Sequence, residues 1–129
     1  MWSFCYEIPL LYESNMLKKE ILRKKEDFSD IYKRGKSIPE RYIVLFYKKN
    51  DLPYNRISFL ASKKVGNSVQ RNRAKRLMKE SYRLHREELR TGYDLIFIAR
   101  NTINGRKRGD VVKSLMNAAA RGKVTGQKR

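Results

Sequence analysis

The densest group of chemically capable side chains lies in the stretch SKKVGNSVQRNRAKRLMKESYR, which runs from Ser62 to Arg83. On a helix from Ser68 to Arg86, six polar or cationic side chains fall within one arc of about 100°. These six are Asn72, Lys75, Arg76, Lys79, Arg83 and Arg86. Glu80 is the one acidic residue in this segment. Fixed cations in a row are suited to binding a polyanion such as RNA or DNA.

The other flank of this helix is expected to be buried. Its members are Val69, Ala74, Leu77, Ser81 and Leu84. Before the helix, Lys63 and Lys64 add charge, Gly66 suits a positive φ, and Asn67 or Ser68 can cap the first turn. The alternative is a solvated basic face without a partner. Like charges four residues apart repel each other, which favours an anionic partner.

Aromatic residues form a second pattern. Tyr42 and Phe46 share one face of a predicted strand, and Phe28 and Tyr32 share one face of a predicted helix. If that helix packs on that strand face, four rings line a groove. Aromatic rings beside basic groups hold unpaired bases by stacking, with little sequence preference. The alternative is an ordinary hydrophobic core.

An independent active site is not expected. His85 is the single histidine, and it lies at the apolar border of the basic helix. The acidic residues show no spacing typical of a metal site. The sequence also lacks a glycine-rich phosphate loop, an activated serine motif and a CxxC pair. We therefore predict no catalytic residue and no metal ligand in this chain.

Composition predicts one folded, basic module. The 129 residues carry 31 Lys and Arg against 13 Asp and Glu, a formal net charge of +18. Hydrophobic residues make up 40% of the chain, too many for a disordered basic tail. The single cysteine, Cys5, fits a reducing compartment such as the cytoplasm. No apolar run approaches the roughly 18 residues that a membrane span needs, so no membrane partner is expected.

The periodicity predicts a two-layer α/β sandwich. The expected order is a helix at 26–34, a turn or edge strand at 37–40, strands at 42–48 and 56–62, the basic helix at 68–86, a strand at 93–100 and a helix at 110–121. Residues 1–15 differ in composition and are expected to be poorly ordered, with Met16 as a possible true start. Residues 16–121 form the predicted domain, and 122–129 a flexible basic tail.

The segment GNSVQRNRAKRLMKE, preceded by SKKV, resembles the RNR signature of the bacterial ribonuclease P protein component. EDFSDIYKRGKSIPERYIVLFY resembles that family's first helix and strand, and YDLIFIAR a later strand. The resemblance covers roughly Leu17 to Arg121. It departs at Ser58, where the family commonly has glycine.

The resemblance implies a fold and a function. The fold is an α/β (α+β) sandwich with a small mixed sheet and about three helices. The basic helix lies in a left-handed crossover between parallel strands, an exception to the usual rule. The resemblance implies that the protein is a subunit of an endoribonuclease whose RNA carries the chemistry and removes the 5′ leader of precursor tRNA. Mg²⁺ is held mainly by that RNA, and no obligate protein partner is expected.

The resemblance and the helical arc together name two sets of site residues. For the catalytic RNA they are Lys63, Lys64, Arg71, Asn72, Arg73, Lys75, Arg76, Lys79 and Arg83. For the leader they are Phe28, Tyr32, Ser37, Arg41, Tyr42 and Phe46. A structural RNA-binding protein of ribosomal type, without a role in catalysis, is the alternative that composition fits equally well.

Overall fold

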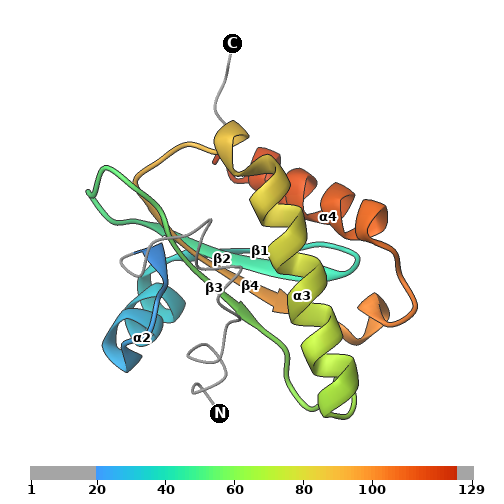
Figure 1. The fold of residues 1–129 in the computed structure, drawn as a ribbon. Coiled ribbons are helices and arrows are strands. Elements are labelled where there is room, and N and C mark those ends of the chain that lie inside the picture. The colour runs from blue at the N-terminus through green and yellow to red at the C-terminus, as the bar shows by residue number, and fades with distance from the viewer. Residues whose placement is uncertain (1–19, 125–129) are drawn as a thin grey trace.

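The computed structural model describes residues 20–124. Its elements in chain order are α2 (Lys25–Arg34), β1 (Lys36–Pro39), β2 (Ile43–Lys49), β3 (Arg56–Leu60), α3 (Ser68–His85), β4 (Tyr93–Ala99) and α4 (Arg108–Arg121). Short 3₁₀ turns cover Arg86–Glu88 and Asn101–Ile103. The predicted helices and strands are confirmed, with small shifts at their ends, and the predicted segment at 37–40 is an edge strand (Figure 1).

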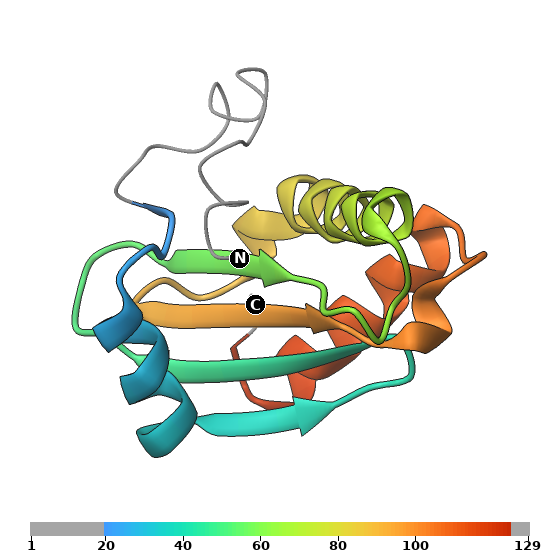
Figure 2. The same cartoon turned by 90° about the horizontal axis from the view of Figure 1, so that it is seen from below.

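The four strands form one mixed sheet in the order β1-β2-β4-β3. β2 pairs antiparallel with β1 and with β4, whereas β3 pairs parallel with β4. The chain between β3 and β4 contains α3, so the basic helix is the crossover of the parallel pair (Figure 2). Ser58 is buried in β3 opposite Ile96, so the strand accommodates its side chain without interrupting the ladder.

Helices cover both faces of the sheet to different extents. α3 and α4 pack together over one face, and α2 lies across part of the other (Figures 1 and 2). β4 lies at the centre and its sequence YDLIFIA is almost continuously apolar, as expected for a strand buried on both faces. Leu95 and Phe97 point to the α3 side and Ile96 to the α2 side. The two-layer sandwich is confirmed, with α2 as a partial third layer.

The buried side of α3 differs from the prediction. Val69 is 76% exposed and Leu84 is 47% exposed, although both were expected to be buried. Met78 and Tyr82 are buried instead, together with the predicted Ala74 and Ser81. The ring of Tyr82 packs beside Phe59 and Phe97. The buried side of the helix is therefore formed by Ala74, Met78, Ser81 and Tyr82, and Val69 and Leu84 lie outside it.

The packed chain continues beyond the predicted end of the domain. Val124 is 0% exposed, its N–H donates to Ala119 O at 2.8 Å, and its carbonyl accepts from the N–H of Arg90. The predicted tail at 122–129 is therefore wrong for its first three residues. Its remainder and the predicted extension at 1–15 lie outside the described residues.

Gly35 joins α2 to β1 for a steric reason. A Cβ atom at this position would lie 2.5 Å from Ile31 O and 2.5 Å from Tyr47 O. The φ of Gly35 is −81°, so the residue does not need the left-handed conformation that ends many helices. Glycine is required here because two backbone carbonyls approach too closely for any side chain.

Candidate nucleic-acid interface

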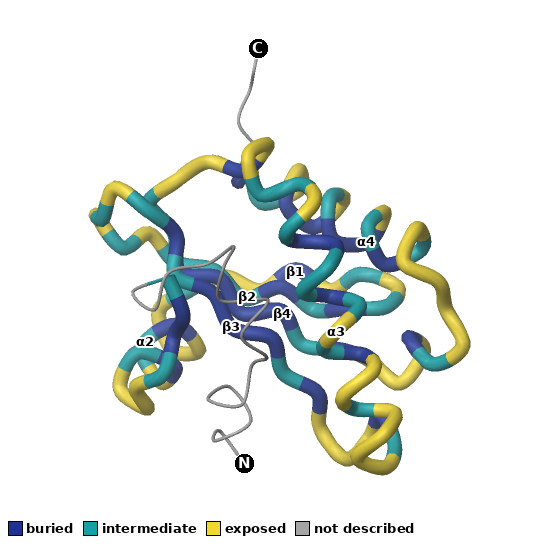
Figure 3. The backbone as a smooth tube through the Cα atoms, in the orientation of Figure 1, coloured by how far each residue is buried: buried dark blue, intermediate teal, exposed yellow. Residues whose placement is uncertain are grey.

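The loop before α3 presents its lysines to solvent and closes the helix end with side chains. Lys63 and Lys64 are exposed, and Gly66 has a φ of +147°, as predicted. Figure 3 shows that much of the chain between β3 and the first turn of α3 is exposed. Asn67 is the N-cap: its side-chain oxygen accepts from Gln70 N at 3.0 Å, and Gln70 Oε1 accepts from Asn67 N at 2.9 Å. This capping box occupies the N–H groups of Asn67 and Gln70 and stabilises the start of the helix.

The predicted RNA-facing residues of α3 fall into two groups by exposure. Asn72, Arg73 and Arg76 are exposed. The partly buried members are Arg71, Lys75, Lys79 and Arg83. Long cationic side chains can cover apolar surface with their methylene groups while their charged ends stay in water. The three exposed residues lie on the solvent-facing side of the helix, whereas the Nε atom of Arg71 is buried.

Few carboxylates offset these cations. Arg83 Nη2 lies 3.0 Å from Glu80 Oε1, and Arg108 Nη1 lies 3.9 Å from the same oxygen. Arg86 pairs with Glu20 at 3.0 Å. Nine Lys or Arg residues lie between positions 63 and 86, against the single acid Glu80. Exposed ion pairs contribute at most about 1 kcal/mol each, so this surface keeps a strong positive charge. We call the cations of residues 63–86 and Asn72 the α3 surface.

On the opposite side of the sheet, α2 and β2 bring aromatic rings together. The rings of Tyr32 and Phe46 meet edge to face, with centroids 5.0 Å apart. Phe46 lies opposite Ser37 of β1 in the antiparallel register. Tyr32 is 39% exposed, whereas Phe28 is 4% exposed. We call Phe28, Tyr32, Ser37 and Phe46 the α2 groove, after the groove predicted from the sequence; Tyr32 and Phe46 provide its accessible ring surface.

Tyr42 does not join this groove, so the expected set of four rings is wrong. Its ring packs against the hydrophobic cluster on the α3 and α4 side, whereas Phe46 packs against the α2 side. Tyr42 precedes β2, which begins at Ile43, so the alternation of a strand does not fix the direction of its side chain. Arg41, predicted with the leader residues, lies beside Tyr42 in a separate hollow.

The margin of the α2 groove carries paired charges. Arg56 Nη2 lies 2.7 Å from Asp94 Oδ2 and Arg56 Nη1 lies 3.2 Å from Asp27 Oδ2, which links β3, β4 and α2. Its hydrogen bond to Asp94 is the main reason that the pKa of Arg56 is raised. Asp30 pairs with Arg34 and with Lys48, each at 3.2 Å. Three cations at this margin, Arg34, Lys48 and Arg56, are therefore paired with acids.

A hollow beside Tyr42 was not predicted. It is lined by Arg41, Tyr42, Asn101, Thr102, Asn104 and Arg106. The polar loop at 101–108 was the feature of the sequence that could have indicated this hollow. Its proximity to the start of β2 depends on the pairing of β2 with β4, which the sequence does not show. Sequence reasoning treated this loop only as a connection.

Residues 20–124 contain no group of three or more His, Cys, Asp or Glu side chains able to hold a metal ion. His85 Nδ1 lies 2.8 Å from Glu88 Oε2 at the end of α3. Over the same range no helix is long and apolar enough to cross a membrane. The carboxylates nearest the two surfaces contact arginine or lysine instead of each other.

A model of the Ribonuclease P family matches residues 16–123. The chain belongs to the ribonuclease P protein family. It is 49% identical over 102 residues to the ribonuclease P protein component of Clostridium botulinum (strain Langeland), covering 78% of this chain and 92% of that protein. The family predicted from the RNR signature is confirmed.

Solved structures of this family share the fold. The Staphylococcus aureus RNase P protein superposes with a TM-score of 0.74 at 30% identity, covering 83% of this chain and 98% of that one. The Thermotoga maritima RNase P protein gives a TM-score of 0.72 at 30% identity, with 79% and 96% covered. The arrangement of α2, the mixed sheet, α3 and α4 is therefore the family's fold.

Proposed function

We propose that this chain is the protein subunit of a ribonuclease P holoenzyme in which an RNA subunit carries the chemistry. The protein binds the catalytic RNA through the α3 surface and the 5′ leader of precursor tRNA in the α2 groove. It thereby assists endonucleolytic removal of the leader. The observation that carries this proposal is the cation excess of the α3 surface in a chain of this family.

Binding at the α3 surface requires no reading of base sequence. Lys and Arg side chains neutralise phosphates and release the counterions condensed around RNA, which supplies affinity that depends on salt. Exposed Arg73 and Arg76, with Lys63 and Lys64, are placed to begin this contact. The partly buried cations along the helix extend it.

The α2 groove suits a single strand. The exposed side of the Tyr32 ring and the edge of Phe46 offer stacking surface to unpaired bases, worth about 1–3 kcal/mol per base. Three cations at the groove margin, Arg34, Lys48 and Arg56, are paired with acids, which reduces the positive field there. Leader binding would thus rest on stacking more than on charge.

Mg²⁺ would be held mainly by the RNA subunit, where it supplies metal-assisted hydrolysis of the phosphodiester. The described part of the protein has no carboxylate cluster that fits the ion. Its role is to supply cations that reduce the repulsion between two polyanions, the catalytic RNA and precursor tRNA. This activity would place the protein in the cytoplasm.

Reconstitution with the cognate catalytic RNA at low Mg²⁺ tests the proposal. We expect the protein to increase the rate of 5′ leader removal from precursor tRNA. The absence of stimulation, with tight RNA binding retained, would favour a structural RNA-binding protein of ribosomal type. Protein without RNA is the control, and cleavage in that control would contradict an RNA-held active site.

A further inference from the structure

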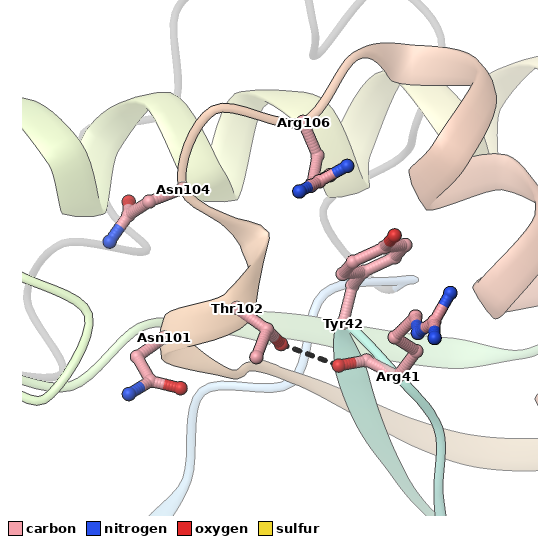
Figure 4. Close-up of a pocket in the computed structure, with 6 residues that line it drawn as sticks. All are labelled: Arg41, Tyr42, Asn101, Thr102, Asn104 and Arg106. Atoms are coloured by element: carbon pink, nitrogen blue, oxygen red, sulfur yellow. Dashed lines mark hydrogen bonds between the residues drawn. The ribbon is translucent and has the colours of Figure 1, made fainter.

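The hollow beside Tyr42 has the composition of a nucleotide site. Its volume is about 520 Å³, and its six lining residues include two arginines, one tyrosine, two asparagines and one threonine (Figure 4). None of the six is acidic. The nearest acid along the chain, Glu40, directs its carboxylate to Arg121 on α4. The positive charge of Arg41 and Arg106 is therefore available to an anion.

Arg106 and Tyr42 form a stacked pair at this hollow. The guanidinium carbon of Arg106 lies 5.6 Å from the centre of the Tyr42 ring, within the range of a cation–π contact. Arg41 extends beside the same ring, so the two guanidinium groups flank the tyrosine (Figure 4). Aromatic rings and guanidinium planes are the groups on which proteins stack unpaired bases, and arginine also binds phosphate.

Hydrogen bonds fix the walls of the hollow. The hydroxyl of Thr102 donates to Arg41 O, which ties the loop after β4 to the turn before β2. Asn104 Nδ2 donates to Val65 O at 2.6 Å, and Arg73 Nη2 donates to Arg106 O at 2.7 Å. The second pair of bonds joins the hollow to the start of α3. An RNA strand on the α3 surface would therefore pass beside this opening.

We propose that the Tyr42 hollow binds one unpaired nucleotide of an RNA that contacts the α3 surface. Its base stacks against the Tyr42 ring, and its phosphate contacts the Arg106 guanidinium, while Arg41 adds positive charge on the other side of the ring. The proposal rests on the proposed function for the identity of the RNA. The site is separate from the α2 groove because Tyr42 and Phe46 pack on opposite faces of the sheet. The nucleotide belongs to either the catalytic RNA or precursor tRNA.

Two variants with matched controls test the site in the full chain. Tyr42→Leu removes the ring and keeps an apolar side chain, whereas Tyr42→Phe keeps the ring. Arg106→Gln removes one charge from the hollow, and Lys113→Gln removes one from an exposed position on α4. We expect Tyr42→Leu to weaken binding of the RNA that fills the hollow about 5- to 100-fold, and Tyr42→Phe to have little effect.

The charge variants also predict a change in salt dependence. If Arg106 contacts a phosphate, Arg106→Gln should lower the slope of log affinity against log salt by about 1, and Lys113→Gln should not. Because Arg106 is exposed and its backbone carbonyl is retained, this variant tests the site even if Tyr42→Leu fails to fold. If the Arg106→Gln variant binds both RNAs with the same affinity as the Lys113→Gln variant at all salt concentrations, the proposal is overturned.

Cross-linking identifies the source of the nucleotide. Tyr42 is replaced by the photoreactive p-benzoylphenylalanine, the holoenzyme is assembled with precursor tRNA, and cross-links are mapped by primer extension on both RNAs. One unpaired position in either RNA supports the site and names its source. Cross-links scattered over both RNAs would contradict it. Leader removal by the wild-type holoenzyme is measured in parallel, so that a failure of the proposed function is recognised separately. If leader removal is not stimulated, the nucleotide site is tested by comparing the binding of the Arg106→Gln and Lys113→Gln variants to a short single-stranded oligoribonucleotide.

Discussion

The α3 surface and the α2 groove both carry cations, but they differ in the acids around them. Between residues 63 and 86 there are nine Lys or Arg residues and one glutamate, and Glu20 pairs with one of the nine, Arg86. Beside the groove, Asp27, Asp30 and Asp94 engage Arg34, Lys48 and Arg56. Unbalanced charge acts over a Debye length, about 10 Å at 0.1 M salt, whereas ring stacking acts only on contact. The first surface therefore suits attraction of an RNA, and the second suits recognition of an unpaired strand.

The largest expected difference between the surfaces is in salt dependence. If about six cations of the α3 surface meet phosphates, affinity for the catalytic RNA should fall roughly 10³-fold between 50 and 200 mM salt. The preference for precursor over mature tRNA should change far less, because stacking carries it. Fluorescence anisotropy at several salt concentrations measures both. A flat profile for the catalytic RNA would contradict the α3 surface as its contact.

Phe28→Ala tests whether this ring belongs to the core or to the groove surface. Phe28 is 4% exposed and packs with Leu22, Ile31 and Ile96, so we expect a loss of about 3–5 kcal/mol in the free energy of unfolding. Urea denaturation measures the loss, with Phe28→Leu as the milder control. Unchanged stability with selective loss of precursor binding would show instead that the ring faces RNA.

Arg73→Gln combined with Arg76→Gln should weaken assembly with the catalytic RNA. Each lost contact to a phosphate costs on the order of 1 kcal/mol, so the pair should reduce affinity about 30-fold at low salt. Lys113→Gln combined with Lys123→Gln removes the same charge from exposed positions outside the α3 surface. Because Arg73 also donates to Arg106 O, thermal denaturation should accompany the binding measurement. Equal losses of RNA affinity in the two double variants would show that total charge, and not the position of Arg73 and Arg76, determines binding.

Tyr32→Leu tests stacking in the groove with little change to the core. Tyr32 is 39% exposed, so its removal should cost less stability than that of Phe28. We expect holoenzyme affinity for precursor tRNA to fall by about 1–3 kcal/mol while affinity for mature tRNA is unchanged. Tyr32→Phe, which keeps the ring, is the matched control. Equal losses for the two tRNAs would exclude leader stacking on this residue.

The smallest effect concerns the packed side of α3 at high pH. Burial raises the pKa of the Tyr82 hydroxyl above its usual value. As the pH rises, the Tyr82 hydroxyl therefore loses its proton in the unfolded chain before it does so in the folded protein. The free energy of unfolding, unaffected by this group below about pH 10, then decreases by at most about 1.4 kcal/mol per pH unit. Urea denaturation between pH 9 and 11 should show a shallower decline for Tyr82→Phe. Identical slopes would mean that Tyr82 ionises freely in the folded protein.

The elements were predictable because their signals are local. Short runs of apolar residues defined β2 and β4, and the spacing of cations and the Asn67 cap defined α3. The RNR signature added the family, which periodicity alone does not supply. The parallel pairing of β3 with β4 came from the resemblance and not from any local pattern.

Positions that depend on tertiary contacts were harder to predict. The sequence does not show that α3 packs on its Met78 and Tyr82 side, which leaves Val69 exposed. Tyr42 stands one residue outside its strand, so period-two reasoning placed its ring on the wrong face. Val124 is buried, and its backbone forms hydrogen bonds with Arg90 and Ala119. Arg90 is distant in sequence, and Ala119 is brought close by the turn at the end of α4. The Tyr42 hollow depends on the pairing of β2 with β4, which brings the loop after β4 close to Tyr42.

The attachment of α2 at both ends has a consequence for ligand entry. Near its start, Asp27 is bound by the Arg56 guanidinium, and at its end Gly35 brings the backbone against the carbonyl of Tyr47. The position of α2 beside Phe46 is therefore fixed during folding. Binding of a ligand there does not require the conformational entropy of α2 to be lost at that step. An RNA strand that binds here must adapt its own backbone to rings whose positions are already fixed.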